Sequence, residues 1–195
     1  ATVADFLAVD KEYRLAHHGI EIMDTVYADG IPNEFIMEQD SYKLIYDTDG
    51  VRITAFDVTH EPIEPAVGYK IEYMGKKVVI SGDTKKNELL TEMAQDCDLL
   101  IHEAMLMDFQ QMLARANEEA GLERNAAIVT DIQDYHTSPA EVAEIAKKAN
   151  VKQVVLNHLA PVPTNRILEK MYLDRMTAFD GEIHLANDGD VFIVQ

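Results

Sequence analysis

Three side chains that commonly bind metals follow apolar, β-prone runs of this chain: His60, Asp83 and His158. Strand ends are rigid platforms, so ligands carried by several of them can converge at one edge of a sheet. Two imidazoles and a carboxylate suit a borderline cation such as zinc, manganese or iron. Taken singly, Asp83 could instead cap a helix and each histidine could end an ordinary strand. Taken together, they predict a metal site with an incomplete set of ligands.

Two further residues could handle protons beside such a site. His136 lies in a polar loop two residues before Ser138, where a histidine can act as a general acid, bind an anion or simply be exposed. Glu103 follows a short apolar run and could fix the tautomer of a histidine. The alternative is that Glu103 begins a helix and is favoured by the helix dipole. The remaining histidines without a partner pattern are expected to be surface or structural residues: His17, His18 and His184.

Other catalytic chemistries have little support. The sequence contains no Gly-x-Ser-x-Gly motif and no glycine-rich phosphate loop. The single cysteine, Cys97, excludes an intrachain disulfide and fits a reducing compartment. The first residues carry no recognisable secretory signal, so a cytoplasmic location is favoured, and a periplasmic one would need a signal upstream. No apolar run approaches the roughly 20 residues that a membrane helix needs, so no membrane association is expected.

The charge of the chain bears on its partners. Its 17 basic and 35 acidic residues give a net charge of −18. Nucleic-acid binders usually carry a basic face that neutralises phosphates, whereas an acidic field attracts cations. On this ground we expect a small-molecule substrate and a chain that does not bind nucleic acid.

The 195 residues are enough for one domain with a real core, and apolar periodicity and turn signals predict its elements. Strands are expected at residues 34–39, 42–47, 51–58, 67–73, 77–81, 98–102, 152–157, 182–186 and 191–194. Helices are expected at residues 1–16, 86–97, 104–120, 138–150 and 164–178, with a turn at 29–32. The first half should form an antiparallel sheet, whereas helices and strands alternate in the second half. The predicted class is α/β (α+β), with residues 1–195 as a single domain.

Several motifs, in this order, resemble the metallo-β-lactamase superfamily, in the branch that holds ribonuclease Z and the arylsulfatase-like hydrolases. The matching segments are Thr59-His60, Gly68–Ile71, Gly75–Thr84, Leu99–Ala104, His136–Pro139 and Val154–Leu159. The resemblance implies an αββα sandwich with two divalent metals, usually zinc, at one edge of the sheets. It also implies that Asp83 bridges the metals, that His60 and His158 are terminal ligands, and that His136 donates a proton to the leaving group. Glu103 matches the His-Glu-Ala-Thr segment of ribonuclease Z, with Met105 in place of the threonine.

The chain departs from this family at one motif. The His-x-His-x-Asp-His segment, which supplies the other metal ligands, is absent, and His17-His18 has the wrong spacing to replace it. We therefore expect the chain to be the C-terminal part of a longer protein, with the fold incomplete at its N-terminus. Strands left exposed would favour a homodimer or pairing with the N-terminal fragment.

The resemblance implies a metal-dependent hydrolase in which metal-activated hydroxide attacks the substrate. Because of the charge, we expect a small ester: a phosphodiester, a sulfate ester, or a lactone or lactam. Two alternatives remain open, a ribonuclease Z-type RNA endonuclease and a truncated or degenerate domain without catalytic activity.

Overall fold

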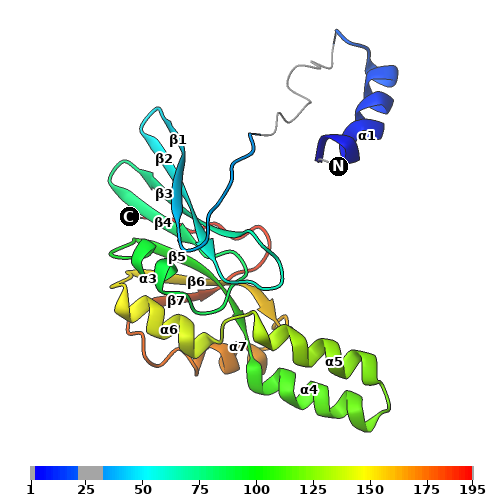
Figure 1. Cartoon of the computed structure of the whole chain (residues 1–195), viewed down its shortest axis with the longest axis vertical. Coiled ribbons are helices and arrows are strands. Elements are labelled where there is room, and N and C mark those ends of the chain that lie inside the picture. The colour runs from blue at the N-terminus through cyan, green and yellow to red at the C-terminus, as the bar shows by residue number, and fades with distance from the viewer. Residues whose placement is uncertain (1–2, 22–32, 195) are drawn as a thin grey trace. The chain divides into compact units, whose positions relative to one another are not determined.

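The computed structural model describes residues 3–21 and 33–194, and the chain divides into two compact units, residues 1–36 and 37–195 (Figure 1). The first unit holds helix α1 (Val3–His18), which confirms the helix expected near the N-terminus. The turn expected at 29–32 lies outside the described residues. Every predicted site residue belongs to the second unit.

The second unit is built on a seven-stranded sheet in which strands follow one another in chain order. Its strands are β1 (Tyr42–Thr48), β2 (Val51–Val58), β3 (Ala66–Tyr73), β4 (Lys76–Ile80), β5 (Leu99–Met105), β6 (Gln153–Ala160) and β7 (Glu182–Leu185). Strands β1 to β4 pair antiparallel, and β4 to β7 pair parallel. The predicted change from an antiparallel to an alternating half is confirmed. The described residues thus form one sheet with helices, a mixed α/β fold.

Helices cover one face of this sheet and build the core (Figure 1). Those on the sheet are α3 (Glu88–Met93), α6 (Pro139–Lys148) and α7 (Arg166–Leu173). Helices α4 (Met107–Glu119) and α5 (Glu123–Asp131) extend away from the sheet, and a 3₁₀ turn, η1 (Ile132–Asp134), follows α5. On the covered face, Val79, Leu100 and Val154 are neighbours in register and fully buried. Ile145 of α6 and Tyr172 of α7 are buried in the same cluster. Burial of this continuous apolar layer fixes the strand register and with it the strand ends.

Helix α6 begins as its sequence predicts. The Ser138 side chain accepts a hydrogen bond from the Glu141 backbone N–H, and the Glu141 carboxylate accepts one from the Ser138 N–H at 2.9 Å. This capping box, with Pro139 in the first turn, anchors the loop that carries His136.

Helices α4 and α5 pack against each other as a hairpin between β5 and that loop (Figure 1). At its base the Met105 N–H donates a hydrogen bond to the Thr137 carbonyl at 2.9 Å. The sequence predicted one long helix here and missed α5, although Gly121 does end α4 with φ at +71°. None of the helices described is long and apolar enough to cross a membrane.

Three other expectations differ from the structure. Residues 34–38 form no strand, because no neighbouring strand pairs with them. Residues 191–194 are also not a strand; instead of joining a hairpin, β7 pairs parallel with β6. The helix expected at 86–97 is reduced to α3: the Asn87 side chain caps its start, and a turn with Asp96 at a φ of +54° follows its end.

Candidate active site

The five predicted site residues lie at one edge of the sheet. Strands β2, β4, β5 and β6 all run in the same direction, so their carboxyl ends meet there. His60 and Asp83 follow β2 and β4, whereas Glu103 and His158 lie near the ends of β5 and β6. His136 arrives from the loop before α6. Because β5 and β6 extend further than predicted, Glu103 and His158 stand on strands rather than beyond them.

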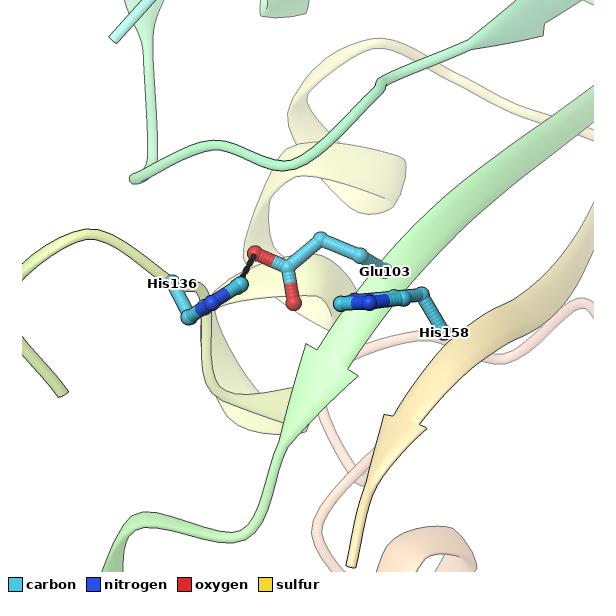
Figure 2. A group of neighbouring side chains, drawn as sticks. All are labelled: Glu103, His136 and His158. Atoms are coloured by element: carbon cyan, nitrogen blue, oxygen red, sulfur yellow. Dashed lines mark hydrogen bonds and ion pairs between the residues drawn. The ribbon is translucent and has the colours of Figure 1, made fainter. Parts of the chain in front are cut away.

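Glu103 and His136 form a buried pair (Figure 2). The Nδ1 of His136 lies 3.1 Å from Oε1 of Glu103, and their side chains are only 8% and 1% exposed. The same oxygen accepts hydrogen bonds from the backbone N–H groups of Thr137 at 2.9 Å and Thr84 at 3.3 Å. Glu103 is therefore held between three donors, and with Nδ1 of His136 donating to it, the other ring nitrogen is directed elsewhere.

The surroundings of His136 favour its protonated form. Burial alone would lower the pKa of His136, but the hydrogen bond to Glu103 and the negative charges of Glu103 and Asp83 outweigh it and raise that pKa. A histidine whose pKa is raised in this way can supply a proton near neutral pH.

Asp83 and His158 meet on the more open side of the site. Oδ1 of Asp83 lies 3.3 Å from Nδ1 of His158, and their side chains are 41% and 57% exposed. Gly82, with φ at +65°, turns the chain here; an added Cβ would lie 2.6 Å from the Val67 carbonyl oxygen. His158 itself has a φ of +41°, an uncommon conformation for a residue with a side chain. Such strain persists where the surrounding structure enforces it, often at functional sites.

His60 contacts the loop that carries His136. Its Nδ1 lies 3.0 Å from the Tyr135 carbonyl oxygen, and its ring stands edge-on to the rings of Tyr135 and His136, with centroids 4.9 and 5.3 Å away. If Nδ1–H donates to this carbonyl, Nε2 is left as the ligand atom, the arrangement common in metal-binding histidines.

Two overlapping sets of residues have the chemistry to hold a cation. One is the predicted set of His60, Asp83 and His158. The other is Glu103, His136 and His158, whose ligand atoms lie within 4.8 Å of one another. Oε2 of Glu103 is buried and has no partner among the described residues, so it could act as a ligand. Imidazole and carboxylate groups in either set fit zinc or a similar divalent metal.

Sequence reasoning missed the residues that tie these segments together. The buried Thr84 hydroxyl accepts a hydrogen bond from the Thr59 N–H at 3.1 Å, next to His60. The Thr137 hydroxyl donates to the Thr84 carbonyl. The only sequence signal was that each threonine directly follows a candidate site residue, Asp83 or His136.

His102 lies beneath the site, on the covered face of β5. Its side chain is fully buried, and its Nδ1 lies 2.7 Å from the Glu103 carbonyl oxygen. Its Nε2 has no partner among the described residues. Burial lowers the pKa of His102 from its ordinary value of 6.5, so this residue is neutral in the folded protein.

This neutral histidine predicts loss of stability in acid. The unfolded chain takes up a proton on His102 more readily than the folded chain, so the stability present above pH 6.5 falls as the pH drops below it. Chemical unfolding between pH 7.5 and 5 should show this slope, up to about 1.4 kcal/mol per pH unit, and His102→Met should remove it. His184→Met is the control, on the edge strand. Equal slopes for the parent chain and His102→Met would contradict the prediction.

Comparison with known proteins places this geometry in a family. The model of the family described as "Beta-lactamase superfamily domain" matches residues 9–159, which include all five site residues. The chain belongs to the beta-lactamase superfamily. This confirms the predicted fold class and the prediction of a metallo-β-lactamase-fold hydrolase at the level of the family.

Relatives of the chain in this superfamily include ribonucleases. The chain is 30% identical over 179 residues to ribonuclease Z of Mycobacterium tuberculosis strain H37Rv, covering 92% of this chain and 59% of that protein. It is 29% identical over 186 residues to ribonuclease Z of Mycobacterium marinum, covering 92% of this chain and 57% of that protein. The chain thus spans less than two thirds of these relatives. They support the ribonuclease Z branch of the predicted resemblance.

Solved structures agree on the fold. The metallo-beta-lactamase fold protein YhfI of Bacillus subtilis has a TM-score of 0.56 at 19% identity, covering 80% of this chain and 54% of that one. Human tRNase Z, short form, has a TM-score of 0.51 at 24% identity, covering 80% of this chain and 48% of that one.

One expectation is corrected by these relatives. We expected a small-molecule ester as substrate and no nucleic acid, but the similar proteins are ribonucleases. The expectation failed because it used the net charge of the whole chain, whereas binding depends on the field at the site.

Proposed function

We propose that this chain carries metal-binding and proton-transfer residues of a ribonuclease Z-type endonuclease, which hydrolyses a phosphodiester bond of RNA. The observation that carries the proposal is the buried Glu103–His136 pair beside Asp83 and His158. The similarity to ribonuclease Z supports RNA as the substrate class.

His60, Asp83 and His158 would hold the divalent metals; Asp83 lies 3.3 Å from His158. When bound, such metals, zinc by resemblance, lower the pKa of water toward neutrality and stabilise negative charge on the phosphate. The chain's own residues do the rest. His136 donates a proton to the leaving oxygen, while Glu103 orients its ring and stabilises the charged form.

The test combines metal content with cleavage. The purified 195-residue chain is loaded with zinc or manganese, its bound metal is counted by mass spectrometry, and it is incubated with a precursor transfer RNA carrying a 3′ extension. We expect bound metal and a discrete cleavage product that disappears after chelation. A chain that binds no metal, or binds metal and leaves the RNA intact, would overturn the proposal.

A further inference from the structure

If this acidic chain acts on RNA, part of its surface near the candidate site must bind the negatively charged RNA backbone. Three cavities adjoin the candidate site: one of about 260 Å³ beside His60, one of about 470 Å³ beside His136 and one of about 490 Å³ beside His158. The third has Asp188 and no lysine or arginine among its described lining residues. They differ in charge, and this difference indicates the path of the substrate.

The cavity beside His60 is acidic. Four carboxylates line it, from Asp40, Asp57, Glu61 and Glu64, and no lysine or arginine is among its described lining residues. A phosphate placed here would be repelled by several charges at short range. The carboxylates therefore disfavour an RNA phosphate inside this cavity.

The cavity beside His136 contains two lysines, Lys85 and Lys86. Lys86 forms an ion pair with Glu144, in which its Nζ lies 2.5 Å from the Glu144 Oε2. The side chain of Lys85 is exposed and makes no ion pair or hydrogen bond within the described part of the chain. Its backbone is fixed, because the Lys85 N–H donates to the Thr59 carbonyl at 2.9 Å, next to His60.

Two acidic residues also line this second cavity, Asp134 and Glu141. Glu141 is engaged in the helix cap, where its carboxylate accepts hydrogen bonds from the Ser138 N–H and hydroxyl at 2.9 and 2.7 Å. Asp134 is exposed at the rim, where solvent screens its charge. Lys85 is thus the cation left available for an anionic ligand beside His136.

We propose that Lys85 binds a backbone phosphate of the RNA on the leaving-group side of the scissile bond. This rests on the proposed function, since His136 marks the side on which the leaving oxygen receives its proton. Lys85 shares that cavity with His136 and offers a charge-assisted contact to phosphate. The carboxylates beside His60 oppose the reverse orientation, so the strand binds in one direction.

The test is the salt dependence of RNA binding, measured by fluorescence anisotropy with a labelled single-stranded 12-nucleotide RNA in the presence of a chelator. Lys85→Ala should weaken binding about tenfold at low salt and reduce the slope of log K against log salt by about 0.7 to 1. Lys85→Arg should retain both. Lys43→Ala, a matched change of an exposed lysine on the edge strand β1, should change neither.

An unchanged slope in Lys85→Ala, or an equal loss in Lys43→Ala, would overturn the proposal, as would a parent chain that does not bind the RNA. The design separates this inference from the proposed function. RNA bound through Lys85 but never cleaved by the metal-loaded chain would overturn the hydrolysis alone. Cleavage with an unchanged slope would overturn the Lys85 contact alone.

Discussion

Asp83→Asn is expected to release the bound metals and to reduce RNA hydrolysis by at least about a thousandfold, since the metals supply several kcal/mol of charge stabilisation. Asp83 follows β4 on a glycine turn and reaches His158 with one carboxylate oxygen at 3.3 Å. The amide keeps the size of the side chain but loses the negative charge that would hold two cations. Metal per chain, counted by mass spectrometry, is the primary measurement.

Asp134→Asn is the matched control, because it removes an exposed carboxylate at the rim of the same site. It should leave metal content unchanged. Retention of two metals by Asp83→Asn would show that Asp83 is not the bridge. If Glu103→Gln releases metal while Asp83→Asn keeps it, the ligands are Glu103, His136 and His158 instead.

His136→Ala is expected to slow cleavage of RNA by about 10²- to 10⁴-fold while metal content stays at the parent level. The reason is that the leaving oxygen of RNA is a strong base and needs a proton, and in the proposed mechanism His136, paired with Glu103, donates it. A nitrophenyl phosphodiester should lose much less activity, because nitrophenolate leaves without protonation. The rates on the two substrates, measured on the same preparation, give the comparison.

His184→Ala serves as the control for this second substitution, since His184 lies on β7 beside Glu182 rather than in the site. It should leave both rates unchanged. Metal loss in His136→Ala would identify His136 as a ligand. Equal losses on RNA and on the nitrophenyl substrate would contradict a role as proton donor.

Local sequence signals were sufficient for most strands and for the start of α6. Residues 51–58 are mostly apolar and β-prone and follow the turn signal Asp49-Gly50, and β2 spans the same residues. The segment 34–39 has similar β propensity but no strand beside it, so propensity alone misled. The continuation of β5 through Glu103 was also missed, because a buried carboxylate is acceptable in a strand only where donors from distant loops reach it.

The sequence predicted which residues belong to the candidate site, but not the contacts between them. Order along the chain and position at strand ends identified His60, Asp83 and His158, and the strand directions bring them to one edge. The contact of Asp83 with His158, and the three donors around Glu103, depend on segments far apart in sequence. Nothing in the sequence distinguishes Lys85 from other lysines, because the cavity that it shares with His136 forms only on folding.

The hydrogen bond between Met105 and Thr137 joins the two ends of the α4–α5 hairpin. This bond lies next to Glu103 and His136 and helps to hold their side chains 3.1 Å apart. Because loop-closure entropy grows slowly with length, the outer end of this hairpin can be lengthened or shortened at little energetic cost. Its base is fixed, since Phe109 of α4 packs against the core and Asp108 forms an ion pair with Arg175. The outer end of the hairpin can therefore change in length without moving the residues of the candidate site.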